Sequence, residues 1–182
     1  CPAEPGDASP PDFTGPDCKP TSLWALDPQG RDLWVRARLS AEAITGEVEG
    51  PVGLHIAMKA SSAVWLNGTP LGANGRPGPD RASEVPGRMN AVLFVPRDRI
   101  TPGVNTLDMR LSSHHGFIDL VRPVHWVRFG AFTDPTRSML SAYAPSLLML
   151  SVFIAGLLVF AVTAWRGPRR GLSGLNAALS LA

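Results

Sequence analysis

The chain has 182 residues, of which 45% are hydrophobic, and it contains 18 glycines and 18 prolines. This composition favours a turn-rich β domain combined with an apolar segment. The net charge of +2 is small and dispersed, which argues against a nucleic-acid partner. Only Lys19 and Lys59 of the 17 basic residues are lysines, and this arginine bias indicates a bacterial genome of high GC content.

The first 22 residues are rich in Pro, Gly and Asp, and they predict an extended extracytoplasmic leader without a core of its own. The chain begins at Cys1 with no initiator Met, so we expect that a secretory signal has been removed or excluded. Cys1 and Cys18 are the only cysteines. In an oxidising compartment they can pair and close the leader into a loop. Lipidation of Cys1 and two unpaired thiols are the alternatives.

Residues 23–132 show short apolar or alternating runs that are separated by clusters of Gly, Pro and Asn. Alternation with a period of two predicts β-strands, and no long amphipathic helix interrupts the runs. A series of short antiparallel strands predicts an all-β antiparallel β-sandwich or jelly roll. The predicted strands cover 32–39, 52–60, 63–66, 91–96, 105–112 and 124–129.

Two turns separate these strands. Asn67-Gly68 lies between apolar flanks and predicts a tight hairpin, because both residues tolerate a positive φ. The same residues with Thr69 match a glycosylation sequon, but a bacterial protein favours the hairpin interpretation. A second turn, 101–105, leads into the strand that begins at Asn105.

The segment 74–88 is a long, charged, Gly/Pro-rich loop, and loops on rigid β scaffolds often carry binding function. Arg76, Glu84 and Arg88 are its candidate ligand-binding residues, together with the nearby charges of Asp80 and Arg81. A solvated connector is the alternative interpretation.

Three further side chains are candidate ligand-binding residues. His114 and His115 follow a predicted core strand, where they can contact a polar ligand, bind a metal, sense pH or simply support the fold. A metal site needs three or four ligands and the core has no cysteine, so we predict no metal. Trp65, beside the hairpin tip, can stack on a sugar ring or pack on its neighbours. We predict no catalytic residue and no cofactor, because neither a Gly-x-Ser-x-Gly elbow nor an HExxH motif occurs.

Residues 144–165 carry no charge, and about 22 residues of helix are enough to cross a hydrocarbon core of about 30 Å. Tyr143 and Trp165 bracket this segment, as aromatic side chains do at membrane interfaces. Pro145 is expected in its first turn, and residues 133–143 are expected to be a linker. The segment predicts a transmembrane helix in contact with the lipid bilayer.

The short segment 166–170 contains Arg166, Arg169 and Arg170 and predicts a cytoplasmic loop under the positive-inside rule. The β domain then lies outside the cytoplasm. Residues 171–182 are apolar but too short to span, and they predict the start of a second transmembrane helix. We expect the protein to continue beyond this point.

Three segments together resemble galactose-binding-like jelly rolls: SSAVWLNGTPLG (61–72), FVP (94–96) and PGVNTLDMRLSS (102–113). The resemblance covers residues 23–132, and its motifs specify a fold more than a ligand. With a membrane span directly after it, the arrangement resembles the N-terminal part of a bacterial sensor histidine kinase. The resemblance implies a periplasmic sensor domain, a multi-helix region in the inner membrane, a homodimer and a cytoplasmic kinase. No motif of the kinase occurs in this sequence.

Three functions follow as hypotheses. The first is the sensing and membrane-relay part of a two-component receptor that binds an unknown periplasmic small molecule or glycan. The second is a membrane-anchored module that binds a protein partner. The third is a fragment of a carbohydrate-active enzyme, for which the sequence gives the weakest support, because any β domain with 15 acidic residues permits a carboxylate pair.

Overall fold

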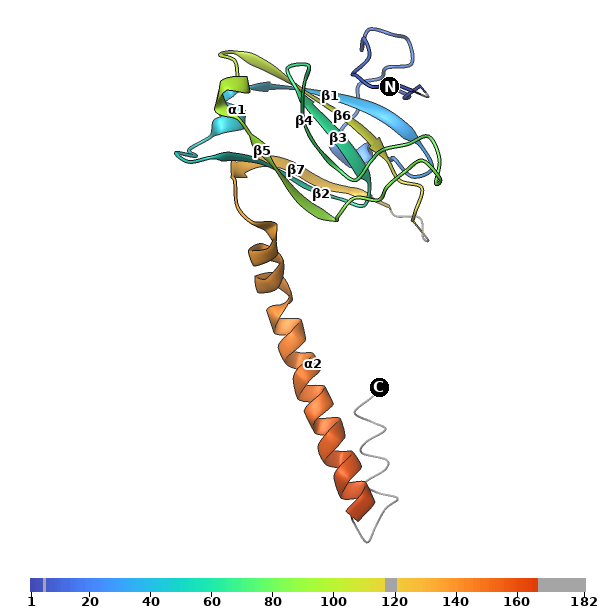
Figure 1. The fold of residues 1–182 in the computed structure, drawn as a ribbon, viewed down its shortest axis with the longest axis vertical. Coiled ribbons are helices and arrows are strands. Elements are labelled where there is room, and N and C mark those ends of the chain that lie inside the picture. The colour runs from blue at the N-terminus through green and yellow to red at the C-terminus, as the bar shows by residue number, and fades with distance from the viewer. Residues whose placement is uncertain (5, 117–120, 167–182) are drawn as a thin grey trace. The chain divides into compact units, whose positions relative to one another are not determined.

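The computed structural model describes residues 1–4, 6–116 and 121–166, and it divides the chain into two units, Cys1–Thr133 and Asp134–Ala182. The first unit contains two antiparallel β-sheets, and the described part of the second is the helix α2, Pro135–Arg166 (Figure 1). The predicted β-sandwich followed by an apolar helix is therefore confirmed.

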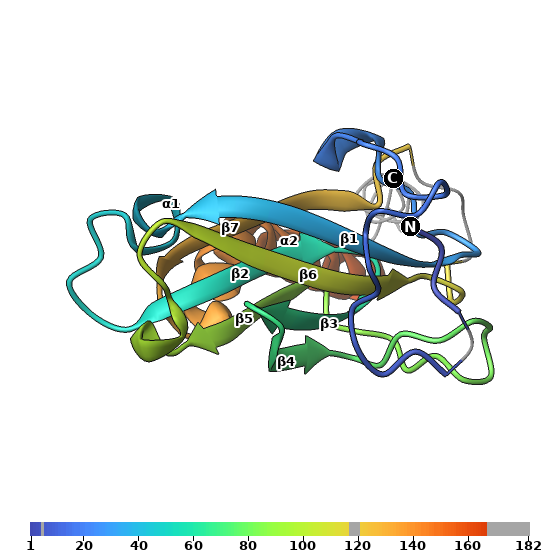
Figure 2. The same cartoon turned by 90° about the horizontal axis from the view of Figure 1, so that it is seen from above.

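One sheet has four strands in the order β1-β6-β3-β4, and the other has three in the order β5-β2-β7. Figure 2 shows the two layers from above, with β1 and β4 at opposite edges of the four-stranded sheet. The strands are β1 (Asp32–Ser40), β2 (Val52–Met58), β3 (Ser61–Leu66), β4 (Thr69–Asn74), β5 (Asn90–Val95), β6 (Val104–Ser112) and β7 (Val124–Ala131).

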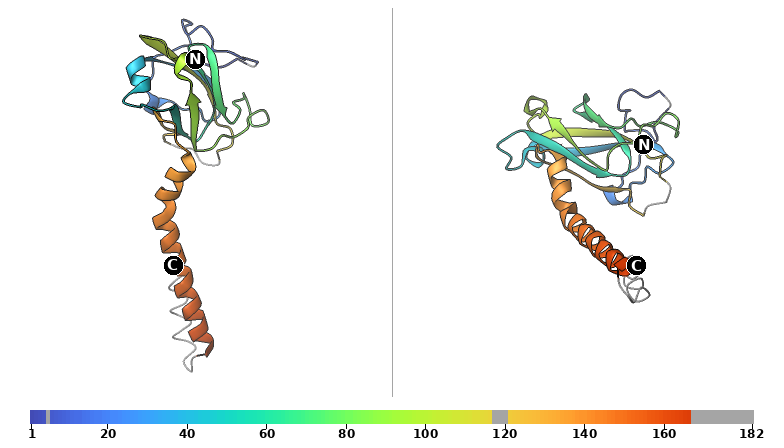
Figure 3. Two further views of the ribbon diagram at one scale, coloured as in Figure 1. Left: turned by 60° about the vertical axis from the view of Figure 1, so that its left-hand side comes forward. Right: turned by 60° about the horizontal axis from the view of Figure 1, so that its bottom comes forward.

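The alternating side chains place one apolar face of each sheet against the other. In β6, every second residue from Leu107 to Leu111 faces the core, and Asp108 and Arg110 lie on the outer face. The views in Figure 3 show the two layers from other sides. The core between them is formed by Leu54, Ile56, Met58, Val64, Leu66, Leu107, Met109 and Leu111.

Short helices occupy some of the connections. They are η1 (Leu23–Ala25), α1 (Ala41–Thr45) and η2 (Arg97–Arg99). α1 begins after Ser40, whose hydroxyl accepts a hydrogen bond from the N–H of Ala43 at 3.1 Å. The predicted hairpin joins β3 to β4, and Asn67 and Gly68 have φ values of 51° and 74°.

The leader, predicted to be extended and without a core of its own, lies against β1. Cys1 and Trp34 exchange two backbone hydrogen bonds, and the N–H of Ala3 donates to the carbonyl of Asp32 at 2.9 Å. A disulfide joins Cys1 to Cys18. Trp34 points to the outer face of its sheet yet is only 1% exposed. The leader therefore pairs with β1. Without the leader, the edge of this strand and the indole ring of Trp34 would face water.

The helix α2 begins within residues 133–143, which the sequence analysis treats as a linker. The carboxylate of Asp134 accepts a hydrogen bond from the N–H of Thr136 at 2.8 Å, and Pro135 occupies the first helical position. Asp followed by Pro is a strong signal for a helix start. Pro145 therefore lies in the helix interior and not in a first turn.

The stretch Tyr143–Thr163 of α2 has 21 residues with a mean hydropathy of 2.5, so by length and composition it can cross a membrane. Residues 167–170 of the predicted basic loop lie outside the described residues. The whole of the predicted second helix, 171–182, lies outside them too.

Candidate ligand-binding pocket

A pocket of about 270 Å³ lies where the β2–β3 connection meets the segments that flank Glu84 and follow β6. Its size suits a single small ring more than an extended ligand. The lining is mixed, with apolar side chains beside one acid and two basic groups. It consists of Gln29, Met58, Lys59, Ala60, Ser61, Glu84, Pro86, Gly87, Met89, Ser113, His115 and Gly116.

Glu84 is the central polar residue of this pocket and is only 6% exposed. Its Oε2 accepts hydrogen bonds from the hydroxyl of Ser112 at 2.8 Å and from the N–H of His114 at 2.9 Å. Its other oxygen, Oε1, has no hydrogen-bond partner among the described residues. Among the described residues, Ser62 Oγ is the one buried side-chain polar atom without a hydrogen-bond partner, so Oε1 is accessible and is the free acceptor that this pocket offers to a ligand.

Two serine hydroxyls fix the orientation of Glu84. The hydroxyl of Ser112 donates to Glu84, so it can only accept in its 2.9 Å contact with the hydroxyl of Ser61, which also lies 3.1 Å from the carbonyl oxygen of Ser112 as its donor. Ser112 also accepts the N–H of Gly78 at 3.1 Å. The carboxylate is therefore held by a chain of hydrogen bonds from β3 and β6, and its position is set before any ligand arrives.

The loop that carries Glu84 folds back on itself as a short hairpin. Arg76 and Val85 exchange two backbone hydrogen bonds of 2.8 and 2.9 Å. Gly75 has a φ of +79°, and a Cβ at that position would lie 2.3 Å from the carbonyl oxygen of Val85, so only glycine fits. The side chain of Asn74 forms two hydrogen bonds of 2.7 Å to the backbone of Arg88 and closes the base.

The two adjacent histidines have different contacts. His114 Nε2 lies 3.0 Å from the carbonyl oxygen of Gly78, and His115 Nε2 lies 3.1 Å from that of Arg81. A carbonyl oxygen only accepts hydrogen bonds, so both rings carry a proton on Nε2. Both imidazoles thus fasten the Glu84 loop to the segment after β6, and of the two only His115 also lines the pocket.

The remaining predicted site residues lie outside the pocket lining. Trp65 packs against Trp34 on the outer face of the four-stranded sheet, with ring centroids 4.9 Å apart. Arg76 donates from Nε to the carbonyl of Ser83 at 3.3 Å, and Arg88 is held through its backbone. The structure therefore brings Glu84 and His115 together in one pocket, supported by His114.

Sequence reasoning missed the serines and methionines of the site. Ser61 and Ser112 lie in strands and face each other across the β3–β6 pair, a relation that only the register reveals. Met58 and Met89 line the pocket, and the N–H of Met58 donates to the carbonyl of Met89 at 3.0 Å. The two Ser-Ser pairs, 61–62 and 112–113, were the sequence feature from which these two serines could have been predicted.

Asp80 provides a further electrostatic feature at the exposed tip of the loop. Its carboxylate accepts hydrogen bonds from the hydroxyl of Ser83 at 2.7 Å and from the N–H of Ser83 at 2.8 Å, and these lower its pKa. No group of three or more His, Cys, Asp and Glu side chains that could hold a metal ion occurs among the described residues.

No family model matches the sequence, and no curated protein matches it. One solved structure that it resembles is a β-D-mannosidase from Dictyoglomus thermophilum, with 20% identity and a TM-score of 0.32. The match covers 46% of this chain and 9% of the mannosidase chain.

Fold and pocket together define the class of protein to which this chain belongs. It is a β-sandwich domain with a small end pocket around a buried carboxylate, and its last strand is followed within four residues by a helix long and apolar enough to cross a membrane.

Proposed function

We propose that this chain is the extracytoplasmic sensing and membrane-relay part of a bacterial receptor, in the class of sensor histidine kinases of two-component systems. The observation that carries the proposal is the open Oε1 of Glu84 in a pocket of a domain that precedes an apolar helix. The ligand is a small polar molecule, such as one sugar residue of a glycan, in the periplasm.

The pocket chemistry supports a neutral ligand that carries a hydroxyl group. Glu84 Oε1 accepts from that hydroxyl, and Lys59 and His115 supply polar groups on the same lining. The side chains of Met58 and Met89 offer an apolar wall on which the C–H face of a sugar ring can pack.

A continuous set of hydrogen bonds connects the pocket to the exit of the domain. The N–H of Lys59 donates to the carbonyl of Pro123 at 2.8 Å, directly before β7, and Met58 pairs with Val124. At the far end of β7, the N–H of Phe132 donates to the carbonyl of Pro51 at 2.8 Å. A ligand that shifts Met58 or Lys59 therefore acts on the strand that leads to α2.

Signalling requires that the ligand bind one of two helix arrangements more tightly than the other, because equal affinity shifts no population. A differential affinity of about tenfold corresponds to about 1.4 kcal/mol, the scale of a single charge-assisted hydrogen bond.

The Glu84→Gln variant tests the pocket. A glutamine keeps one oxygen for Ser112 and His114 but places an amide donor where Glu84 Oε1 accepts, so a ligand hydroxyl can no longer donate there and the charge-assisted hydrogen bond is lost. We expect binding at least tenfold weaker, with a thermal unfolding midpoint close to that of the unmodified protein. The measurement is isothermal titration calorimetry with the methyl glycosides of glucose, galactose, mannose and N-acetylglucosamine.

Glu49→Gln, an exposed acid outside the pocket lining, is the matched control and should bind like the unmodified protein. The proposal is contradicted if no glycoside binds, or if Glu84→Gln binds all of them unchanged. Hydrolysis of any of the glycosides would instead assign the domain to a carbohydrate-active enzyme.

A further inference from the structure

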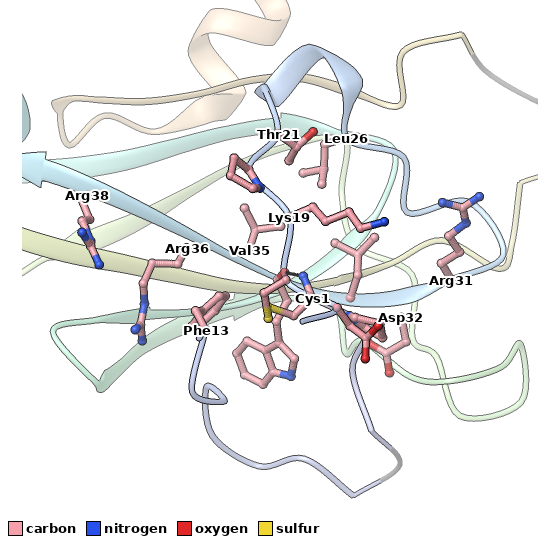
Figure 4. Close-up of a pocket in the computed structure, with 16 residues that line it drawn as sticks. Cys1, Phe13, Lys19, Thr21, Leu26, Arg31, Asp32, Val35, Arg36 and Arg38 are labelled. Carbon is pink, nitrogen blue, oxygen red and sulfur yellow. Dashed lines mark hydrogen bonds between the residues drawn. A yellow bond between two sulfur atoms is a disulfide. The ribbon is translucent and has the colours of Figure 1, made fainter. Parts of the chain in front are cut away.

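A second and larger pocket, of about 860 Å³, lies along β1, away from Glu84. Seven of the residues Arg31–Arg38 line it, with alternating side chains from both faces of the strand, so the pocket follows the strand edge. The opposite wall is the leader, with Phe13 and the segment from Asp17 to Thr21. Figure 4 shows Phe13 on one side of β1 and Lys19, Thr21 and Leu26 on the other.

β1 is an edge strand, and the leader already pairs with the first part of that edge. Trp34 exchanges two backbone hydrogen bonds with Cys1, so its N–H and C=O point away from β6. The β1–β6 register continues without a bulge, and residues two apart in a strand point their backbone groups the same way. The N–H and C=O groups of Arg36 and Arg38 therefore point to the free edge.

These four backbone groups are open. None of them has a hydrogen-bond partner among the described residues, and Arg36 and Arg38 are exposed as whole residues. Unpaired groups on an edge strand are a template for pairing with another extended segment. The Cys1–Ala3 segment shows that this edge pairs with an extended chain, because it forms such a bridge between Pro2 and Leu33.

The charge of the pocket selects the partner. Arg36 is neutralised by Asp108, and Asp32 by Arg110. Of the other charged side chains in the lining, three are cations (Lys19, Arg31 and Arg38) and one is an anion (Asp17), and none forms an ion pair within the described part of the chain. An acidic segment complements this excess of positive charge.

We propose that the free edge of β1 binds an extended acidic peptide of a partner protein by β-strand addition. The peptide exchanges backbone hydrogen bonds with Arg36 and Arg38, its acidic side chains face Lys19, Arg31 and Arg38, and its apolar side chains contact Leu26 and Val35 on the pocket floor. This site is separate from the Glu84 pocket and does not depend on the function proposed for that pocket.

The test uses the 182-residue chain in detergent micelles and a fluorescein-labelled hexapeptide of alternating Glu and Val, and it follows binding by fluorescence anisotropy. We expect saturable binding that is at least tenfold weaker for Arg38→Glu. Arg99→Glu, an exposed arginine in η2 outside the pocket, is the matched control and should leave binding unchanged. Glu84→Gln should also leave it unchanged, which separates this site from the other.

Two altered peptides distinguish strand addition from simple charge attraction. A hexapeptide methylated on every backbone nitrogen keeps its charge but loses its donors, and we expect it not to bind. Replacement of Glu by Gln in the peptide should weaken binding at least tenfold.

Equal binding of the methylated or the Gln peptide would overturn the proposal, as would no saturable binding of the acidic peptide. Self-association of the chain without peptide, abolished by Arg38→Glu, would assign the edge to a second copy and also overturn it.

Discussion

The ion pair between Arg36 and Asp108 on the outer face of the four-stranded sheet, in which only the carboxylate is buried, shows how one side chain can depend on another. Arg36 donates to both oxygens of Asp108, at 2.6 and 2.8 Å, and this hydrogen bonding raises the pKa of the guanidinium. The side chain of Asp108 is 0% exposed, whereas that of Arg36 is 29% exposed. The two partners therefore differ in how easily each returns to water when the other is removed.

We expect Arg36→Met to destabilise the domain more than Asp108→Ala does. The first leaves a buried carboxylate without its partner, at a cost of about 3–5 kcal/mol. The second leaves an arginine that can reach water, at a cost of about 1–3 kcal/mol. Urea unfolding followed by tryptophan fluorescence measures both, and equal free energies of unfolding for the two variants would contradict this asymmetry.

Glu84 illustrates what residue-level reasoning can and cannot find. A glutamate in a Gly/Pro-rich loop was a reasonable candidate, but the sequence gives no sign that it is buried. Its burial results from Ser112 and His114, which lie more than 25 residues away and donate to the same oxygen. Trp65, near the hairpin, was an equally reasonable candidate for ligand binding. In the structure its ring packs against Trp34.

At the scale of an element, the leader is the segment whose contacts with the sandwich could not be predicted from its sequence. Its composition is typical of an unstructured chain, but pairing with β1 and one disulfide give it a fixed path. Trp34 Nε1 donates to the carboxylate of Asp7 at 3.1 Å, and Phe13 lies 4.2 Å from the guanidinium of Arg36. The leader thus covers part of the outer face of the four-stranded sheet. Its composition gives no indication of this role.

Removal of the disulfide tests this role. The bridge closes a sequence separation of 17 residues, and in the chain-entropy model its loss costs about 3 kcal/mol. We expect the double variant Cys1→Ser, Cys18→Ser to unfold at lower urea concentration, with a red-shifted emission because Trp34 becomes exposed. Chemical reduction of the unmodified protein is the control and should give the same result. An unchanged midpoint and emission would show that the leader is held without the bridge.

At the scale of the whole molecule, the sandwich and the helix share a very short covalent connection. β7 ends at Ala131 and α2 begins at Pro135, with Asp134 capping the helix. The covalent link between the two units is therefore only three residues long.

Insertion of two glycines between Thr133 and Asp134 tests transmission in the full-length receptor. We expect ligand affinity to stay unchanged, because the pocket is intact, and ligand-dependent phosphorylation to fall at least tenfold. The same insertion between Ser9 and Pro10 in the leader is the control and should leave signalling unchanged. Full ligand-dependent output with the first insertion would show that the signal does not travel along this connection.

The sequence by itself determined the sandwich, the Asn67-Gly68 hairpin and the apolar helix. These features depend on local rules: alternation with a period of two, a positive φ at the turn, and an uncharged run of sufficient length. The start of α2 at Asp134-Pro135 was also present as a local signal, although the prediction placed it later.

Only the tertiary structure decided the two candidate binding sites. The Glu84 pocket depends on the β3–β6 register, which sets Ser61 against Ser112, and the open edge of β1 depends on its position at the end of the sheet. Both are relations between residues far apart in the chain. Strand order and register are set by how whole faces pack together, which no short window of sequence contains.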